Sequence, residues 1–172
     1  FDRLGFFMLE KENISNIIKI FDAGRVQDAI IELLKLIKKY PENHEYTFLY
    51  GEICAKVNKL DEAEKVFLHL LNKNKESLDC LKNLYIVYLK KGNLVKAEKY
   101  ILKFLKLKKE DHNALRDLGY LKFLQHNYEE AYSVYKKILT KINKDVFALN
   151  IYGLTLYFLG NFDESVKYYK KA

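Results

Sequence analysis

Apolar residues recur along this chain at steps of three and four, and polar residues interrupt the pattern at regular intervals. Segment 78–111 shows this most clearly. A first apolar stripe comprises Leu81, Leu84, Tyr85 and Tyr88, and a second comprises Leu94, Ala97, Tyr100, Ile101, Phe104 and Leu105. Lys91-Gly92-Asn93 separates the two stripes. Because such steps place side chains on one helix face, the segment predicts two antiparallel helices joined by a tight turn.

The same pattern returns every 34 residues. Its small buried position is occupied by Ala29, Ala63, Ala97 and Ala131, and the next step reaches Ser165. A fixed period of this length is typical of a solenoid, in which one helical unit is stacked repeatedly. We expect a helix crossing without spare volume at Ala97, so that Ala97→Leu costs more stability than Ala114→Leu.

Each predicted turn has a residue at its centre that tolerates a left-handed backbone. These residues are Gly24, Asn58, Gly92, His126 and Gly160. Glycine adopts this conformation freely, and Asn and His are enriched among the other residues that do so. The helices that follow begin with acidic residues, which complement the helix dipole. Asn127 with Glu130, and Asn161 with Glu164, have the spacing of a capping box.

Composition fits a helical domain with a substantial core. The chain has 172 residues, of which 49% are hydrophobic and 15% aromatic, with one proline. No window approaches the run of about 20 apolar residues that a membrane-spanning helix needs. The chain begins at Phe1, its one methionine is Met8, and it ends partway through a repeat. We therefore expect a fragment of a longer protein, without its true N-terminus.

Charge and cysteines narrow the possible partners. The net charge is +7, but only three of the 30 basic residues are arginine. Because specific nucleic-acid sites rely on the bidentate arginine fork, the lysine excess predicts solvated helix surfaces, and nucleic-acid binding is unlikely. Cys54 and Cys80 lie in apolar helical patterns without metal-ligand spacing. They predict buried free thiols, which fit a reducing compartment such as the cytoplasm.

These features resemble the tetratricopeptide repeat, a helix-turn-helix unit of 34 residues. The matching runs are Leu118-Gly119, Tyr152-Gly153, Ala63 with Phe67, and Ala131 with Tyr135. The resemblance covers residues 10–172 and implies an all-α, right-handed α-solenoid of about five stacked antiparallel helix pairs. Its units would be 10–43, 44–77, 78–111, 112–145 and a truncated 146–172. Residues 1–9 fall outside the pattern and would be irregular or extend the first helix.

No catalytic motif is present. The sequence lacks the glycine-rich phosphate loops, the zinc-protease motif HExxH and the nucleophile motif GxSxG. The four histidines are scattered, and the carboxylates are explained by helix starts and neighbouring lysines. We therefore predict a protein that is not an enzyme and has no cofactor, metal or catalytic residue.

The resemblance implies that the first helices of the units line a concave groove that binds partners. Projection of these helices predicts the groove residues Lys82, Asn83, Lys90, Arg116, Tyr120, Asn150, Ile151, Leu154, Tyr157 and Phe158. The predicted function is a protein-interaction scaffold that holds a peptide or an amphipathic helix in this groove. Two alternatives remain open: a self-assembly module that forms homo-oligomers, and a regulatory or substrate-recruiting region of a larger enzyme.

One use of the family is argued against by these residues. Receptors for chaperone C-terminal tails clamp a carboxylate with Lys and Asn on one first helix and Asn on the next. Lys82 could begin such a set, but the position one turn later is Ile86 and the next helix offers Asp117. Because Asp117 would repel a carboxylate, we do not expect a chaperone-tail receptor.

Overall fold

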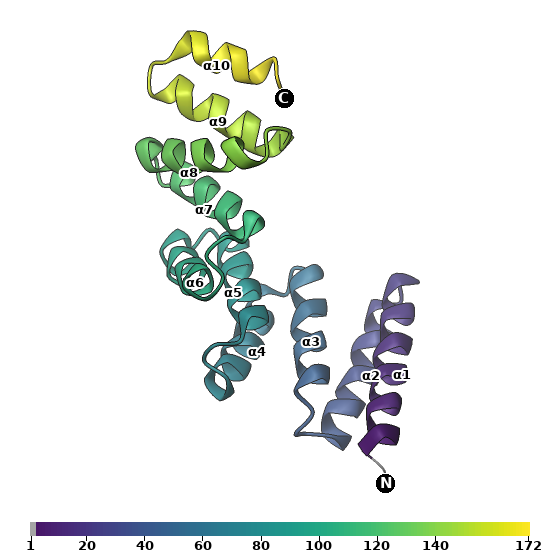
Figure 1. The fold of residues 1–172 in the computed structure, drawn as a ribbon. Helices are drawn as coiled ribbons and strands as arrows, with labels where there is room; N and C mark the ends of the chain where they lie inside the picture. Colours follow the sequence, from purple (N-terminus) through teal and green to yellow (C-terminus); the bar gives the residue numbers. More distant parts are fainter. Residues whose placement is uncertain (1–2) are drawn as a thin grey trace. The chain divides into compact units, whose positions relative to one another are not determined.

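The computed structural model describes residues 3–172, with side chains from Met8 onwards. This part of the chain forms ten α-helices and no strand (Figure 1). The helices are α1 (Arg3–Asp22), α2 (Val26–Lys39), α3 (His44–Lys56), α4 (Leu60–Lys73), α5 (Leu78–Lys90), α6 (Leu94–Leu107), α7 (His112–Leu124), α8 (Tyr128–Lys141), α9 (Val146–Phe158) and α10 (Phe162–Tyr169). None of these helices is long and apolar enough to cross a lipid bilayer.

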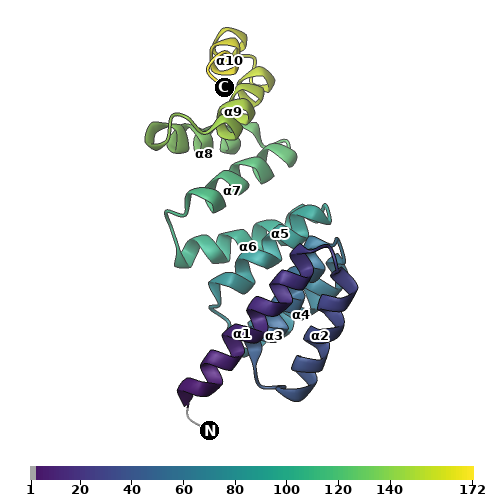
Figure 2. The ribbon, with the colours of Figure 1, turned by 90° about the vertical axis from the view of Figure 1, so that its right-hand side faces the viewer.

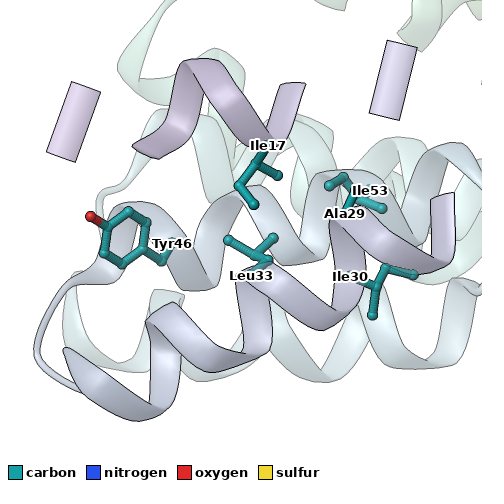
Figure 3. Close-up of a cluster of buried hydrophobic side chains, with 6 residues drawn as sticks. All are labelled: Ile17, Ala29, Ile30, Leu33, Tyr46 and Ile53. Atoms are coloured by element: carbon teal, nitrogen blue, oxygen red, sulfur yellow. The ribbon is translucent and has the colours of Figure 1, made fainter. Parts of the chain in front are cut away.

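The chain divides into two compact units, one up to Lys75 and one from Glu76 to Ala172. In the first unit α2 packs against α1 and α3, and α3 packs against α4. Its core joins Ile17 of α1, Leu33 of α2, and Tyr46 and Ile53 of α3 (Figure 3). Tyr46 is buried, and the side-chain amide of Asn13 donates a hydrogen bond to its hydroxyl group at 3.1 Å. The first three helices are thereby held together.

The second unit consists of the pairs α5–α6, α7–α8 and α9–α10 (Figure 2). Contacts of α6 with α7 and of α8 with α9 link one pair to the next. The core of the last two pairs contains Tyr135 and Ile138 of α8, and Ala148, Tyr152 and Leu156 of α9. In this unit α6 and α8 therefore each pack on their own partner and on the first helix of the next pair, as stacked repeats require.

The turn prediction is confirmed at all five positions. The backbone angle φ is +78° at Gly24, +63° at Asn58, +70° at Gly92, +60° at His126 and +81° at Gly160. The turn therefore has the same left-handed centre even where no glycine is available, and Asn58 and His126 carry the strain of a side chain in that region.

The ladder of small residues is buried throughout. Ala29, Ala63, Ala97 and Ala131 have no exposed surface, and Ser165 is 2% exposed. The Ser165 hydroxyl donates to the backbone oxygen of Gly153 at 2.8 Å, which satisfies its buried polar group. Ala114 also has no exposed surface. Ala114 is therefore as buried as Ala97, and the structure gives no reason for Ala97→Leu to cost more stability than Ala114→Leu.

One of the two predicted capping boxes forms in part, because Glu130 binds the side-chain amide of Asn127 and the Asn127 backbone N–H donates to the Lys122 oxygen instead. Asn127 Oδ1 accepts a hydrogen bond from the Glu130 amide at 3.3 Å, and Asn127 Nδ2 donates to Glu130 Oε1 at 2.7 Å. Asn161 makes no side-chain cap bond at the start of α10, so the prediction was wrong there. The spacing alone therefore did not decide whether a cap forms.

Candidate functional site

The ten predicted groove residues all lie in the second unit, on its first helices α5, α7 and α9. Besides contacting their pair partners, α7 and α9 contact each other directly. Lys82 and Lys90 are exposed on α5, whereas Arg116 and Tyr120 on α7 are partly buried. The first helices therefore form a surface that changes in accessibility from one helix to the next.

A partly buried hydrogen bond links α5 to α7. The Tyr85 hydroxyl donates to Asp117 Oδ2 at 3.2 Å. Burial raises the pKa of Tyr85 far above its ordinary value, and the nearby carboxylate of Asp117 raises it further. Burial also raises the pKa of Asp117, although Arg116, Tyr85 and Lys82 act in the opposite direction. Tyr85 therefore keeps its proton and serves as the donor that stabilises a partly desolvated carboxyl group.

Arg116 connects α7 to α9. Its guanidinium lies 5.4 Å from the centre of the Phe147 ring, and its Nη1 is 3.7 Å from Asp145 Oδ2. The Tyr120 ring meets Phe147 edge-on at 5.5 Å. The Nε atom is buried and, among the described residues, has no hydrogen-bond partner. Two predicted residues, Arg116 and Tyr120, thus converge on Phe147, and one arginine donor remains unsatisfied.

Asp145 caps α9 and compensates the charge of Arg116. It accepts hydrogen bonds from the Ala148 amide at 3.0 Å and from His112 Nε2 at 2.8 Å. Burial alone would raise the pKa of Asp145, but the Ala148 amide, His112 and Arg116 together hold it below its usual value. Arg116 therefore faces carboxylates, and this part of the surface is a balanced polar cluster with little excess positive charge.

The remaining predicted residues differ in how far they face solvent. Asn83 Nδ2 donates to the Asp79 backbone oxygen at 3.0 Å, so its amide is engaged along its own helix. Ile151 packs against the core of α8 and α9. Asn150 and Leu154 are partly buried on α9. Ile151 and Leu154 are both partly buried, and of the two only Ile151 packs against that core.

Tyr157 and Phe158 belong to a separate group of rings where α9 ends. We call this group the aromatic edge; it comprises Phe123, Tyr128, Tyr157, Phe158 and Phe162. Phe158 stacks on Tyr128 with ring centres 4.7 Å apart, and Tyr157 meets Phe162 at 5.3 Å. Tyr157 and Phe158 are about half exposed. The two residues predicted for the apolar end of the groove therefore extend to the edge formed by the helix turns.

A salt-bridge network that was not predicted from the sequence joins three helices. Lys122 Nζ of α7 contacts Glu98 Oε1 of α6 at 2.6 Å and Glu130 Oε2 of α8 at 2.8 Å. Gln125 Nε2 donates to Glu98 Oε2 at 2.7 Å. The hydrogen bond from Lys122 holds the pKa of Glu98 below its usual value, and the same lysine lowers the pKa of Glu130. No spacing rule within one helix could find these partners, which lie 24 and 8 residues from Lys122.

Tyr85 and Asp145 were also absent from the predicted site. A signal existed for Tyr85, because it occupies the position that Gly51, Gly119 and Gly153 hold in other repeats. Within the described part of the chain, no three His, Cys, Asp or Glu side chains gather as a metal site would require. The chemistry that the surface offers is hydrogen bonding, ion pairing and aromatic contact.

Comparisons with known proteins agree with the helix-pair architecture. A family model described as tetratricopeptide repeat matches residues 21–76, and a second model with this description matches residues 148–172. No curated protein matches the chain in sequence. Eight of the solved structures that resemble it share 14–21% identity with it, which establishes the fold alone. That fold is an all-α solenoid of helix pairs.

Three solved structures illustrate the likeness. MamA from Desulfovibrio magneticus has a TM-score of 0.85 at 14% identity, covering 94% of this chain and 91% of its own. YrrB, described as a TPR protein with an unusual peptide-binding site, has a TM-score of 0.76 at 16% identity, covering 99% and 90%. A tetratricopeptide repeat protein from Parabacteroides merdae has a TM-score of 0.79 at 16% identity, covering 92% and 62%.

Proposed function

We propose that the chain is a tetratricopeptide repeat protein that acts as a non-catalytic protein-interaction scaffold and binds a peptide or an amphipathic helix. The proposed binding surface lies on α5, α7 and α9. The observation that carries the proposal is the cluster around Arg116, in which an ion pair with Asp145 and the rings of Tyr120 and Phe147 meet on α7 and α9. The Arg116 side chain is 32% exposed, so its accessible part can donate a hydrogen bond to a peptide backbone oxygen.

The balance of charge at this surface favours a particular kind of ligand. Because Asp117 and Asp145 already face Arg116, a strongly acidic segment would gain little there. A segment that offers backbone carbonyls to the α5–α7 part and an apolar side chain to Leu154 would use what both parts provide. An amphipathic helix or an extended peptide with one apolar anchor meets this requirement.

The proposal is tested by selecting ligands from a displayed peptide library and measuring their dissociation constants by fluorescence anisotropy. Lys82→Glu and Leu154→Asp should each raise Kd about tenfold, which corresponds to about 1.4 kcal/mol. Matched controls are Lys137→Glu and Leu102→Asp, which make the same changes at exposed positions of second helices. If the controls weaken binding as much as the surface variants, while all four proteins melt normally, the ligand does not bind at the proposed surface.

Self-assembly is a second candidate, which one observation favours. Phe162, Val166 and Tyr169 of α10 are 57%, 51% and 40% exposed. The residues 34 positions earlier, Tyr128, Tyr132 and Tyr135 of α8, are half-buried or buried. A second copy could cover the open face of α10. Light scattering across a concentration series would show a rising mass if it does, and a constant monomer mass would reject this candidate.

A reducing compartment such as the cytoplasm is proposed from the cysteines. Cys54 and Cys80 are buried free thiols, and burial raises the pKa of each above its ordinary value. Thiols in this state are poor nucleophiles and are suited to a structural role. Labelling of the native protein with a thiol reagent should be slow at both sites, and fast labelling would contradict the structural role.

A further inference from the structure

The aromatic edge is a continuous row of rings along the turns of two successive helix pairs. The ring centre of Phe123, at the end of α7, lies 5.6 Å from the ring centre of Tyr128 and 5.8 Å from that of Phe158. Tyr157 meets Phe158 at 5.6 Å and Phe162 at 5.3 Å, so the row passes from α9 to the start of α10. Each ring therefore contacts at least one ring of another residue in the row, which fixes the orientation of the group.

These rings remain open to solvent. Phe162 is 57% exposed, Tyr157 54% and Phe158 51%. Isolated exposed aromatics need no explanation, but adjacent large rings that share one edge form the kind of apolar surface that marks interaction sites. Since all three are already held by ring contacts, a partner that binds there loses little conformational entropy from this side.

The charge next to the rings is negative, in a unit that is otherwise basic. Residues 76–172 contain 18 Lys and Arg against 11 Asp and Glu, whereas residues 1–75 contain 12 of each. Glu129 follows Tyr128 and Asp163 follows Phe162, and both carboxylates are exposed. Within the described residues neither carboxylate forms an ion pair. The edge therefore combines open rings with unpaired negative charge.

Elsewhere in the chain, cations lie over rings. Lys96 Nζ is 5.0 Å from the centre of the Tyr88 ring, and Lys136 Nζ is 5.4 Å from that of Tyr132. In the described part of the chain, no lysine or arginine lies over a ring of the aromatic edge. Lys122 of the neighbouring helix is held by Glu98 and Glu130. Within the described residues, the chain thus places no cation of its own over these rings.

We propose that the aromatic edge is a docking surface for a basic segment of a partner protein. Arginine or lysine side chains of that segment would lie over Tyr157, Phe158 and Phe162 and pair with Glu129 and Asp163. An acidic segment would be repelled by these carboxylates, and a proline-rich one would use the rings but leave the carboxylates unpaired. The inference rests on the proposed function only in taking a protein as the partner, because it names a different surface and different chemistry.

The test uses the chain of residues 1–172 and three fluorescent peptides of twelve residues. The first carries three Arg-Leu pairs separated by Gly-Ser. The second replaces arginine by citrulline, which keeps the shape and removes the charge, and the third replaces arginine by glutamate. Anisotropy should detect binding of the arginine peptide, with Kd at least about tenfold lower than for the other two. Equal binding of the citrulline or glutamate peptide would overturn the proposal.

Variants then locate the binding surface. Phe162→Ala and Phe158→Ala should each raise Kd for the arginine peptide about two- to fivefold, the range of an exposed cation–π contact. The double variant Glu129→Gln, Asp163→Asn should raise it about threefold at low salt and less at 500 mM NaCl. The control Asp61→Asn changes the same repeat position in α4, where Leu60 replaces the aromatic residue, and should leave Kd unchanged.

The outcomes separate this inference from the proposed function. Lys82→Glu should leave binding of the arginine peptide unchanged, since Lys82 lies on α5 and not at the aromatic edge. If Lys82→Glu alters binding while Phe158→Ala and Phe162→Ala do not, the peptide occupies the surface of the first helices, and the inference about the edge is wrong. If the ring and carboxylate variants weaken binding of the arginine peptide and Lys82→Glu does not, the inference about the aromatic edge holds. This outcome stands even if the peptide library yields no ligand for the first-helix surface.

Discussion

Two glycines at the same repeat position should respond in opposite ways to alanine. A methyl group at Gly119 would lie 2.9 Å from Cε2 of Tyr135 and 3.1 Å from Cγ1 of Val134. Tyr135 has no exposed surface, and its hydroxyl donates to the Arg116 backbone oxygen at 3.1 Å. Because the ring is fixed at both ends, it cannot move aside without breaking that bond or disturbing the core.

The net effect at Gly119 follows from two opposing terms. Alanine gains about 1 kcal/mol over glycine within a helix. Overpacking in a filled core costs about 1–3 kcal/mol. We expect Gly119→Ala to lower the free energy of unfolding by about 1 kcal/mol.

Gly153 lacks the second term. A methyl group there would meet ring atoms of Tyr169 at 3.4 Å, an ordinary van der Waals contact, and Tyr169 is 40% exposed near the end of α10. The helical gain should therefore remain, and Gly153→Ala should stabilise the protein by about 0.5–1 kcal/mol.

Calorimetry and urea denaturation followed by circular dichroism would compare both variants with the wild type. A difference of about 1.5–2 kcal/mol between them corresponds to about 3–8 °C in Tm for a chain of this size. Both glycines lie in the second unit, so the same unfolding transition reports on both. If the two variants shift Tm in the same direction by the same amount, the close approach of Tyr135 to Gly119 is not the reason that glycine occupies the position.

Four further substitutions test the polar contacts. Lys122→Met should lower the free energy of unfolding by about 1–2 kcal/mol near neutral pH. Because the pKa of Glu98 is lowered in the folded state, the stability of the wild type should fall more steeply than that of the variant as the pH drops from 5 to 3. Parallel stability curves would contradict this expectation. Asp117→Asn should raise the free energy of unfolding near neutral pH, because burial raises the pKa of the native carboxyl group. This gain should vanish at pH values below the ordinary pKa of aspartate. A variant less stable than the wild type at pH 7 would refute the reasoning. Asn127→Ala should lower the free energy of unfolding by about 1 kcal/mol and Asn161→Ala by about a few tenths, because only Asn127 forms a side-chain cap bond. Equal losses measured by urea denaturation would contradict this assignment of the cap.

The sequence was most informative where one local conformation recurs. The left-handed turn centres at Asn58 and His126 were predicted because Gly24, Gly92 and Gly160 hold the same position. The repeat supplies several independent observations of one backbone requirement, so a departure in one unit can be interpreted from the others. The division into units ending at residues 43, 77, 111 and 145 rests on this regularity and stays a prediction.

Contacts between repeats were largely invisible for the opposite reason. Tyr85 and Asp117 are 32 residues apart, and Lys122 and Glu98 are 24 apart, so neither pair follows from the period of one helix. Whether two such side chains meet depends on how successive helix pairs pack, which varies with the residues at each interface. Projection of a helix can name the side that a residue faces, but it does not identify the partner that neutralises it.

This limit bears directly on the choice of partner. Taken one at a time, the predicted groove residues Lys82, Lys90 and Arg116 would attract acidic groups. In the structure Arg116 faces Asp145 and Asp117, while exposed carboxylates accompany open rings at the aromatic edge. Since a charge attracts a ligand only to the extent that its own protein leaves it unpaired, the uncompensated groups, and not the most numerous ones, should determine what binds. For this chain that reasoning favours uncharged hydrogen-bonding groups on the first helices and basic groups at the edge.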